Sequence, residues 1–351
     1  MIYCGIDPHK KKHVAVLCDP QGKKISEKSF NNNIEGYQEL VEWSSINTEE
    51  VIFGIENPQS YGRWLAQYLK VKEKKVYSVP SSLTGLYRRR STARDKNDEN
   101  DALAVARAVI QEEEKLKEVL VEGKTVELSI LVEHYDNLKE ESIKIVNRVH
   151  SYLLNVDLYG KVGRLTRIKD LTLFIERCEN NIEGVAGMYW NIIKSVSNRL
   201  LEVLKEMKKY LSEMEIILKE LKADKLLEEK GVGVYLAAKI LGISGNANLF
   251  KNESSFANYA GVAPISCSSG RNTNYRVNPG GNRQLNYAIH TIAKSKMTYE
   301  EKSKEYYNKK KSEGKTPRES LRCLKRQVCK QIFKILENME SINKIKKVSI
   351  S

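Results

Sequence analysis

The sequence has few of the residue patterns that build several common kinds of protein site. Its six cysteines are scattered without a CxxC pair, and its five histidines form no HExxH motif. These absences argue against disulfides and zinc, and they fit reduced thiols in the cytosol. No apolar run reaches the ~18 residues of a membrane span, and the N-terminus lacks the apolar region and cleavage site of a signal peptide. We expect a cytoplasmic protein without a membrane partner.

Acidic residues are outnumbered by basic ones. The 351 residues include 59 Lys and Arg but only 45 Asp and Glu, which gives a formal net charge of +14. Such an excess predicts a polyanionic partner, either nucleic acid or an anionic membrane surface. With 41% hydrophobic residues, the chain can bury the cores of two or three domains.

Proline is missing from the middle of the chain, between Pro80 and Pro264. Apolar residues from Val126 to about Tyr159, and a heptad-spaced series from Val196 to Leu221, predict two long helices there. Helices with this seam favour a coiled coil, within the chain or between chains. An ordinary helical bundle without a role in oligomerisation is the alternative. We assign residues 116–225 to a helical linker and oligomerisation region.

Residues 1–115 have the pattern of an α/β domain. Short apolar runs alternate with turn signals and then with helical patterns, in the order β-β-β-α-β-α-β. This order predicts a mixed sheet whose later strands are parallel to the first. The expected strands cover residues 2–6, 14–18, 24–30, 51–56 and about 75–79.

Carboxylates follow two of these strands. Asp7 ends the first strand and Glu56 ends the fourth. Because open α/β sheets place their sites at the carboxyl ends of strands, we expect these two acids to lie together. The segment "DKNDENDALAVARAV" adds Asp98 and Asp101, which share a face at the start of a helix. Asp95 shares that face if the helix extends back.

Four converging carboxylates repel one another, and a hard divalent cation relieves the repulsion. Mg²⁺ prefers oxygen ligands, and two ions about 3.5–4 Å apart suit in-line attack at a phosphodiester. We expect Mg²⁺, with Mn²⁺ as the alternative, at Asp7, Glu56, Asp98 and Asp101. Taken singly, Asp98 has an ordinary explanation as a helix N-cap and Glu56 as a water-exposed strand end. Their order along the chain is more specific than any one of them.

Residues 226–351 are expected to form a mainly α-helical domain with a basic tail. The segment "EKGVGVYLAAKILG" resembles a helix-hairpin-helix element, whose turn at Gly231 and Gly233 offers backbone amides to a phosphate. A tight turn without a nucleic-acid contact is the alternative. The segment "SCSSGRN" follows, and taken alone it predicts a polar loop whose serines only make turns.

Basic side chains flank each of these segments. Their contacts would go largely to phosphates, which position nucleic acid without specifying its sequence. No recognition helix or zinc finger is apparent, and for the three consecutive arginines a solvated loop is the alternative. The candidate nucleic-acid-binding residues are Lys10, Lys11, Lys12, Arg88, Arg89, Arg90, Gly231, Gly233, Arg271, Arg276 and Arg283.

The order of these motifs resembles a known family. The four acids on a β-β-β-α-β start resemble the RuvC-like ribonuclease-H fold of DEDD recombinases, and "KNDENDA" resembles their K-x-D-x-x-D-A motif. The segments "GVG", "YAGVAP", "SSG" and "GGNRQL" resemble the C-terminal domain of the insertion-sequence-one-ten transposases, to which Piv-type DNA invertases are related. The resemblance covers nearly the whole chain, in the family's order.

This resemblance implies a DNA recombinase with a composite site. The four acids would bind Mg²⁺, while a serine of the C-terminal domain attacks DNA and becomes covalently linked to it. That serine would be Ser269, with Ser268 as the next choice. The resemblance also implies a noncoding guide RNA, encoded by the element, that pairs with donor and target DNA. It further implies a tetramer of two dimers, in which the acids of one subunit face the serine of another, acting at the nucleoid of a prokaryote.

Two features of the sequence depart from the family's pattern. Arg271-Asn272 replaces the Gly-Lys that often follows the serine–glycine pair, and Asn286 stands where an arginine is expected.

The segment from Val262 to Arg283 contains no Asp, Glu or His. Activation of a serine there must come from elsewhere in the fold, because a hydroxyl is a poor nucleophile without a base or metal.

Three functions remain open at this point. The first is a transposase that uses a covalent phosphoserine. The second is a metal-dependent RuvC-like nuclease or Holliday-junction resolvase, which hydrolyses DNA with water and forms no covalent intermediate. The third is a nucleic-acid scaffold without catalysis, which the complete set of acids disfavours.

Overall fold

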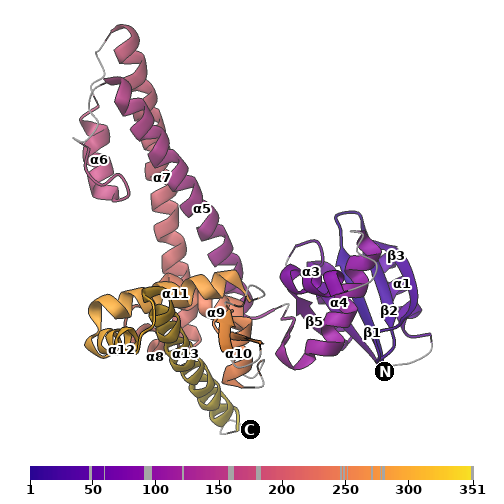
Figure 1. Ribbon diagram of the computed structural model, residues 1–351. Coiled ribbons are helices and arrows are strands. Elements are labelled where there is room, and N and C mark those ends of the chain that lie inside the picture. Colours follow the sequence, from indigo (N-terminus) through magenta and orange to yellow (C-terminus); the bar gives the residue numbers. More distant parts are fainter. Residues whose placement is uncertain are drawn as a thin grey trace. The chain divides into compact units, whose positions relative to one another are not determined.

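The structure is a computed structural model and is shown in Figure 1. It describes residues 1–46, 50–58, 60–90, 97–120, 122–156, 162–178, 183–245, 247, 250, 252–269, 272–276, 278 and 281–348. The chain divides into two units. One contains Met1–Val126, Glu228–Val232 and Ile243–Ser351, and the other contains Glu127–Leu227 and Gly233–Gly242. No helix among the described residues has the length and apolar character to cross a membrane.

A mixed sheet of six strands forms the N-terminal part of the chain, in the order β3-β2-β1-β4-β5-β6. Strand β1 pairs in parallel with β4, and β4 pairs in parallel with β5, so the predicted mixed sheet is confirmed. The sixth strand, antiparallel and two residues long, was not predicted. The strands are β1 (Ile2–Pro8), β2 (Lys12–Cys18), β3 (Lys24–Asn31), β4 (Val51–Glu56), β5 (Lys75–Val79) and β6 (Lys117–Glu118).

Helices cover both faces of this sheet. Side chains alternate between the two faces along each strand, so the strands contribute to one hydrophobic core on each face. Cys4 and Ile6 of β1 belong to a core with residues of α1 (Ile34–Ser44) and α2 (Arg63–Val71). On the other face, the core contains residues of α3 (Ser81–Arg90) and α4 (Asp98–Glu112). A short 3₁₀ helix, Glu113–Lys115, follows α4.

Two glycines let α4 lie directly on the sheet. A Cβ atom on Gly5 of β1 would lie 2.1 Å from the carbonyl oxygen of Ala102 and 2.3 Å from the amide nitrogen of Ala106. A Cβ on Gly54 of β4 would lie 2.5 Å from a methyl group of Val109. The helix backbone therefore rests on β1 at a distance that only glycine permits.

We expect Gly5→Ala to destabilise the N-terminal domain by roughly 2–3 kcal/mol, since the clash is with helix backbone and α4 must move. Urea denaturation followed by circular dichroism measures the loss. Gly85→Ala is a matched control, because among the described residues its Cβ would meet only the end of the Arg89 side chain, at 3.6 Å. An equal effect of the two substitutions would show that α4 does not pack on Gly5 as described.

Two long helices, α5 (Lys124–Leu153) and α7 (Gly184–Glu220), lie side by side within the chain (Figure 1). They run antiparallel, because Glu141 pairs with Arg199 at 2.7 Å while His134 pairs with Glu206 at 3.3 Å. Their buried contacts include Ile145, Leu200 and Val203, so the predicted apolar seam of α7 faces α5. A coiled coil that joins two subunits stays a prediction, as does the division of the chain at residues 115 and 225.

The remaining elements are mainly helical, as predicted, with one β-hairpin that was not. Phe256 of α10 contacts Phe333 of α13 with ring centroids 5.4 Å apart, and both rings are buried. These elements are the 3₁₀ helix Leu154–Val156, α6 (Ile168–Glu176), α8 (Asp224–Leu227), α9 (Val234–Ser244), α10 (Glu253–Tyr259), β7 (Ile265–Ser269), β8 (Asn272–Arg276), α11 (Arg283–Tyr299), α12 (Glu301–Ser312) and α13 (Pro317–Val348).

Candidate functional site

The sheet places Asp7 and Glu56 at neighbouring strand ends. Ile6 of β1 is paired with Ile55 of β4 in parallel register, so the two acids follow directly at the carboxyl ends of adjacent strands. Alternation puts Asp7 on the same face as Gly5, and Glu56 on the same face as Gly54. That is the face on which α4 packs. Both acids therefore lie beneath the helix that carries the other two.

The first turn of α4 supplies Asp98 and Asp101. Asn97 is the N-cap of this helix, and its side chain accepts a hydrogen bond of 2.7 Å from the amide of Asn100. The alternative that Asp98 is the capping residue is therefore wrong, and its carboxylate is left for other contacts. Asp101 is 8% exposed and forms an ion pair with Arg88 of α3. Asp95 lies outside the described residues.

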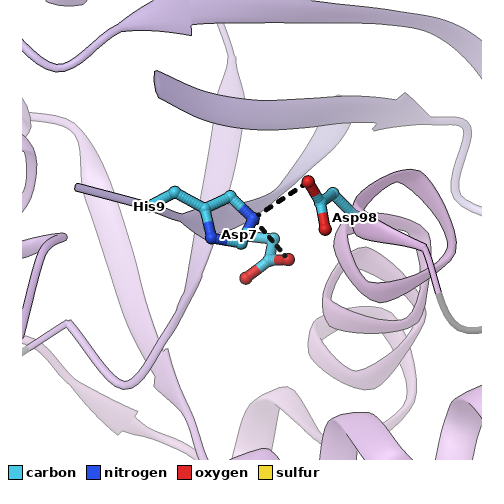
Figure 2. A group of neighbouring side chains, drawn as sticks. All are labelled: Asp7, His9 and Asp98. Atoms are coloured by element: carbon cyan, nitrogen blue, oxygen red, sulfur yellow. Dashed lines mark ion pairs between the residues drawn. The ribbon is translucent and has the colours of Figure 1, made fainter. Parts of the chain in front are cut away.

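His9 lies between two of these acids, as Figure 2 shows. Its Nε2 atom is 3.3 Å from an oxygen of Asp7 and 3.2 Å from an oxygen of Asp98. Within the part of the chain that the structure describes, these three residues are the group whose ligand atoms could hold a metal ion, all within 4.8 Å of one another. The sequence analysis missed His9, although its position two residues after Asp7 was a usable signal.

The environment of Asp7 disfavours its charged form. The Asp7 side chain is 13% exposed, and its burial raises the pKa of the carboxyl to about 6. Repulsion from Glu56, Asp101 and Asp98 acts in the same direction, while His9 opposes it. Each of the other three predicted acids thus acts electrostatically on Asp7. A divalent cation fits here, because it would replace this repulsion with attraction.

We expect Asp7→Asn to stabilise the metal-free protein at pH 8 by about 1–2 kcal/mol, after allowing for partial contact with water. The folded state holds its proton more tightly than the unfolded state, so wild-type stability rises as the pH falls through about 6. The advantage of asparagine is therefore largest above pH 6 and fades towards pH 4. Thermal unfolding in EDTA at several pH values measures it.

Excess Mg²⁺ should make the wild-type protein more stable than Asp7→Asn. An ion at 100 times its Kd adds about 2.7 kcal/mol to the stability of the state that binds it. Only the wild-type protein should gain that stability. Equal stabilisation of both proteins by Mg²⁺ would place the ion away from Asp7.

The predicted basic residues of the N-terminal domain fall into two groups. Lys10, Lys11 and Lys12 are exposed where β1 turns into β2. Arg88 faces inward to Asp101, whereas Arg89 and Arg90 are exposed at the end of α3. The structure therefore leaves the lysines and the last two arginines accessible to phosphates, while Arg88 neutralises an acid.

The candidate nucleophiles lie on strand β7 and not in a loop. Ser269 is its last residue and pairs with Asn272, the first residue of β8, while Ser268 pairs with Thr273. Arg276 ends β8. Arg271 lies outside the described residues.

The Gly231 turn is held in a fixed position. Gly231 has φ of 85° and packs against α11, where a Cβ atom would lie 2.9 Å from that of Ser295. The next residue of α11, Lys296, is buried and forms an ion pair with Glu229 of the turn. Gly233 is exposed, with no other heavy atom within 4 Å of a Cβ built there among those described.

Asn286 has a structural role in α11. Its side-chain amide donates to the carbonyls of Ala260 and Gly261 at 2.9 and 3.0 Å, and its oxygen accepts from Lys325 at 2.6 Å. An arginine here has no acceptor for Lys325 and would place a second positive charge beside it. Arg283, the first residue of the same helix, is exposed.

Two family models match the chain. The model DEDD_Tnp_IS110, described as a transposase, matches residues 4–156, and the model described as "Transposase IS116/IS110/IS902 family" matches residues 223–308. The chain belongs to the IS110 family of transposases. It is 24% identical to an uncharacterized 43.6 kDa protein of insertion element IS110 from Streptomyces coelicolor, over 96% of this chain and 94% of that protein. It is 23% identical to an uncharacterized 44.8 kDa protein of insertion element IS116 from Streptomyces clavuligerus, over 89% of each.

Membership in this family gives the site its chemical setting. A transposase cuts and rejoins DNA, so DNA is a substrate of this chain. The DEDD domain and the cluster of Asp7, His9 and Asp98 together indicate a divalent metal ion. The two matched segments contain all four acids and both candidate serines.

Proposed function

We propose that this transposase cuts and rejoins DNA through a covalent phosphoserine at Ser269, with Mg²⁺ held by Asp7, Glu56, Asp98 and Asp101. The observation that carries the proposal is the environment of Asp7, a largely buried carboxylate whose pKa is raised by burial and by three further acids. Such a cluster is costly without a cation. Phosphodiester chemistry is the use of such a site that fits a transposase.

In the proposed reaction, the Ser269 hydroxyl attacks the scissile phosphorus. A bond forms between Oγ and phosphorus, the bond from phosphorus to one strand's oxygen breaks, and that strand leaves with a hydroxyl end. Attack by this hydroxyl on a phosphoserine restores a phosphodiester and frees the serine. A bound divalent ion stabilises negative charge on the phosphoryl oxygens and lowers the pKa of an oxygen nucleophile.

The chain's own residues divide this work between two regions. Since Val262–Arg283 contains no acid or histidine, the base that takes the hydroxyl proton must come from elsewhere, and the Asp7 cluster is the candidate. Arg88 neutralises Asp101 and so limits the negative charge of the acidic cluster. The exposed lysines at positions 10–12 would hold the DNA backbone beside it.

We also propose that a noncoding RNA of the element guides the enzyme by pairing with donor and target DNA. The net charge of +14 supports binding of several nucleic-acid strands, and base pairing would supply the sequence specificity. A homodimer, and a tetramer on DNA, would bring the acids of one subunit to the serine of another. The site of action would be the cytoplasm of a prokaryote, at the nucleoid.

A trapping experiment tests the function. The protein is produced in cells that carry the DNA flanking its gene. The cells are lysed in denaturant, and the protein is examined for DNA that remains attached to it. We expect an adduct that EDTA prevents in the purified reaction, and a bound RNA transcribed from the flanking noncoding segment. Cut DNA with free hydroxyl and phosphate ends and no adduct would assign the nuclease or resolvase function instead. Absence of a specific RNA would contradict guidance.

A further inference from the structure

His9 is the residue of the acidic cluster whose role the four-acid scheme leaves unassigned. We propose that His9 is itself a metal ligand, and that its nitrogen makes this site favour Mn²⁺ over Mg²⁺ more strongly than an all-oxygen site does. The inference rests on the proposed metal site and goes beyond it, because it adds a ligand and states a preference between metals.

The geometry of Nε2 suits a ligand better than a hydrogen-bond donor. This atom is buried from solvent and makes no hydrogen bond to any residue that the structure describes, although carboxylate oxygens lie 3.2 and 3.3 Å away. It therefore points between Asp7 and Asp98 without being aligned on either (Figure 2). Ligand atoms at right angles around an ion with bonds of about 2.1 Å lie about 3.0 Å apart, close to both separations.

The backbone of His9 is held in place. Its N–H donates to the carbonyl of Lys12 at 3.2 Å, and its own carbonyl accepts from the Asn32 side chain at 3.4 Å. The Asn32 oxygen in turn accepts from the hydroxyl of Tyr37, a buried residue of α1. These contacts fix the position of the His9 backbone, from which the imidazole ring extends. Supporting hydrogen bonds commonly hold metal ligands in place in this way.

A nitrogen ligand changes the preference between metals. Mg²⁺ takes oxygen ligands and keeps several waters, whereas imidazole suits transition metals. Mn²⁺ accepts both kinds of donor and is bound more weakly than the later metals of its row. An imidazole added to two carboxylates should therefore raise the affinity for Mn²⁺ more than that for Mg²⁺.

The test measures metal binding and not catalysis. Full-length protein without a histidine tag is titrated with Mn²⁺ by electron paramagnetic resonance, and with Mg²⁺ by calorimetry. We expect electron spin echo spectra of bound Mn²⁺ to show coupling to a ¹⁴N nucleus. His9→Gln should lose that coupling and about tenfold in Mn²⁺ affinity, with a smaller loss for Mg²⁺. His9→Asp should keep the ion without the coupling, and should narrow the preference for Mn²⁺.

His134→Gln is a matched control. The two histidines are equally exposed, at 45%, and His134 also lies 3.3 Å from a carboxylate, that of Glu206. This substitution should leave the coupling and both affinities unchanged. The wild-type spectrum remains informative even if a His9 variant does not fold.

The outcomes separate this inference from the proposed function. Mn²⁺ that binds the wild type without nitrogen coupling, and equally well in His9→Gln, would overturn the ligand role and leave the acids as the metal site. Mn²⁺ binding that Asp7→Asn does not weaken would overturn the metal site itself, and His9 with it.

Discussion

Ser269→Ala is expected to abolish the covalent DNA–protein adduct and to reduce strand cleavage by at least about 10³-fold, because no other group can take over a lost nucleophile in the same position. DNA binding should be unchanged, since a single hydroxyl adds little to contacts that are mainly electrostatic. The measurement is the fraction of DNA that migrates with protein on a denaturing gel.

Two neighbouring serines make this prediction sharp. Ser266→Ala, on the same strand β7, is the control and should form adduct at the wild-type level. Ser268→Ala decides between the two candidate nucleophiles. Adduct lost in Ser268→Ala but kept in Ser269→Ala would assign the attack to Ser268. Cleavage kept in both variants would mean that water attacks.

Asp7→Asn is expected to reduce cleavage by about 10³-fold or more, because a divalent ion contributes several kcal/mol to stabilising charge in the transition state. The carboxylate that holds it lies at the centre of the cluster, where Glu56, Asp98 and Asp101 all act on it. Since the same substitution should stabilise the metal-free fold, loss of activity cannot be attributed to unfolding. Such opposition between stability and activity is common at active sites.

Glu99→Gln is the control for this prediction. Glu99 lies in the first turn of α4 beside Asp98, but it forms an ion pair with Lys24 of β3. The substitution removes one negative charge from the first turn of α4. It should leave the cleavage rate within about twofold of the wild-type rate, as expected of an exposed ion pair. Equal losses in Glu99→Gln and Asp7→Asn would mean that total charge, and not a metal site, controls activity.

Local sequence patterns were sufficient for the sheet and for its acids. Apolar runs and turn residues gave the first five strands, and the rule for parallel strands placed Asp7 beside Glu56. Helical spacing placed Asp98 and Asp101 on one face. The chain's membership in the IS110 family was likewise visible from the order of its motifs. These features depend on residues close together in sequence, or on topology that short patterns dictate.

Other features depended on contacts between distant segments. Strand β6 and the β7–β8 hairpin are short and polar, so no periodicity marked them. The ion pair of Arg88 with Asp101 joins two helices, and the hydrogen bonds of Asn286 join α11 to the end of α10. Such pairings appear only when the helices are packed together.

By itself, the sequence determined the fold class of the N-terminal domain and the family, and it predicted the four acids. The tertiary structure alone decided that Gly5 brings α4 onto the sheet, and that His9 meets Asp7 and Asp98. The reason is physical: periodicity records which face of an element is buried, while the distance between two elements depends on the side chains that separate them. Here glycine leaves no side chain on β1, and the carboxylates of α4 come within reach of the strand ends.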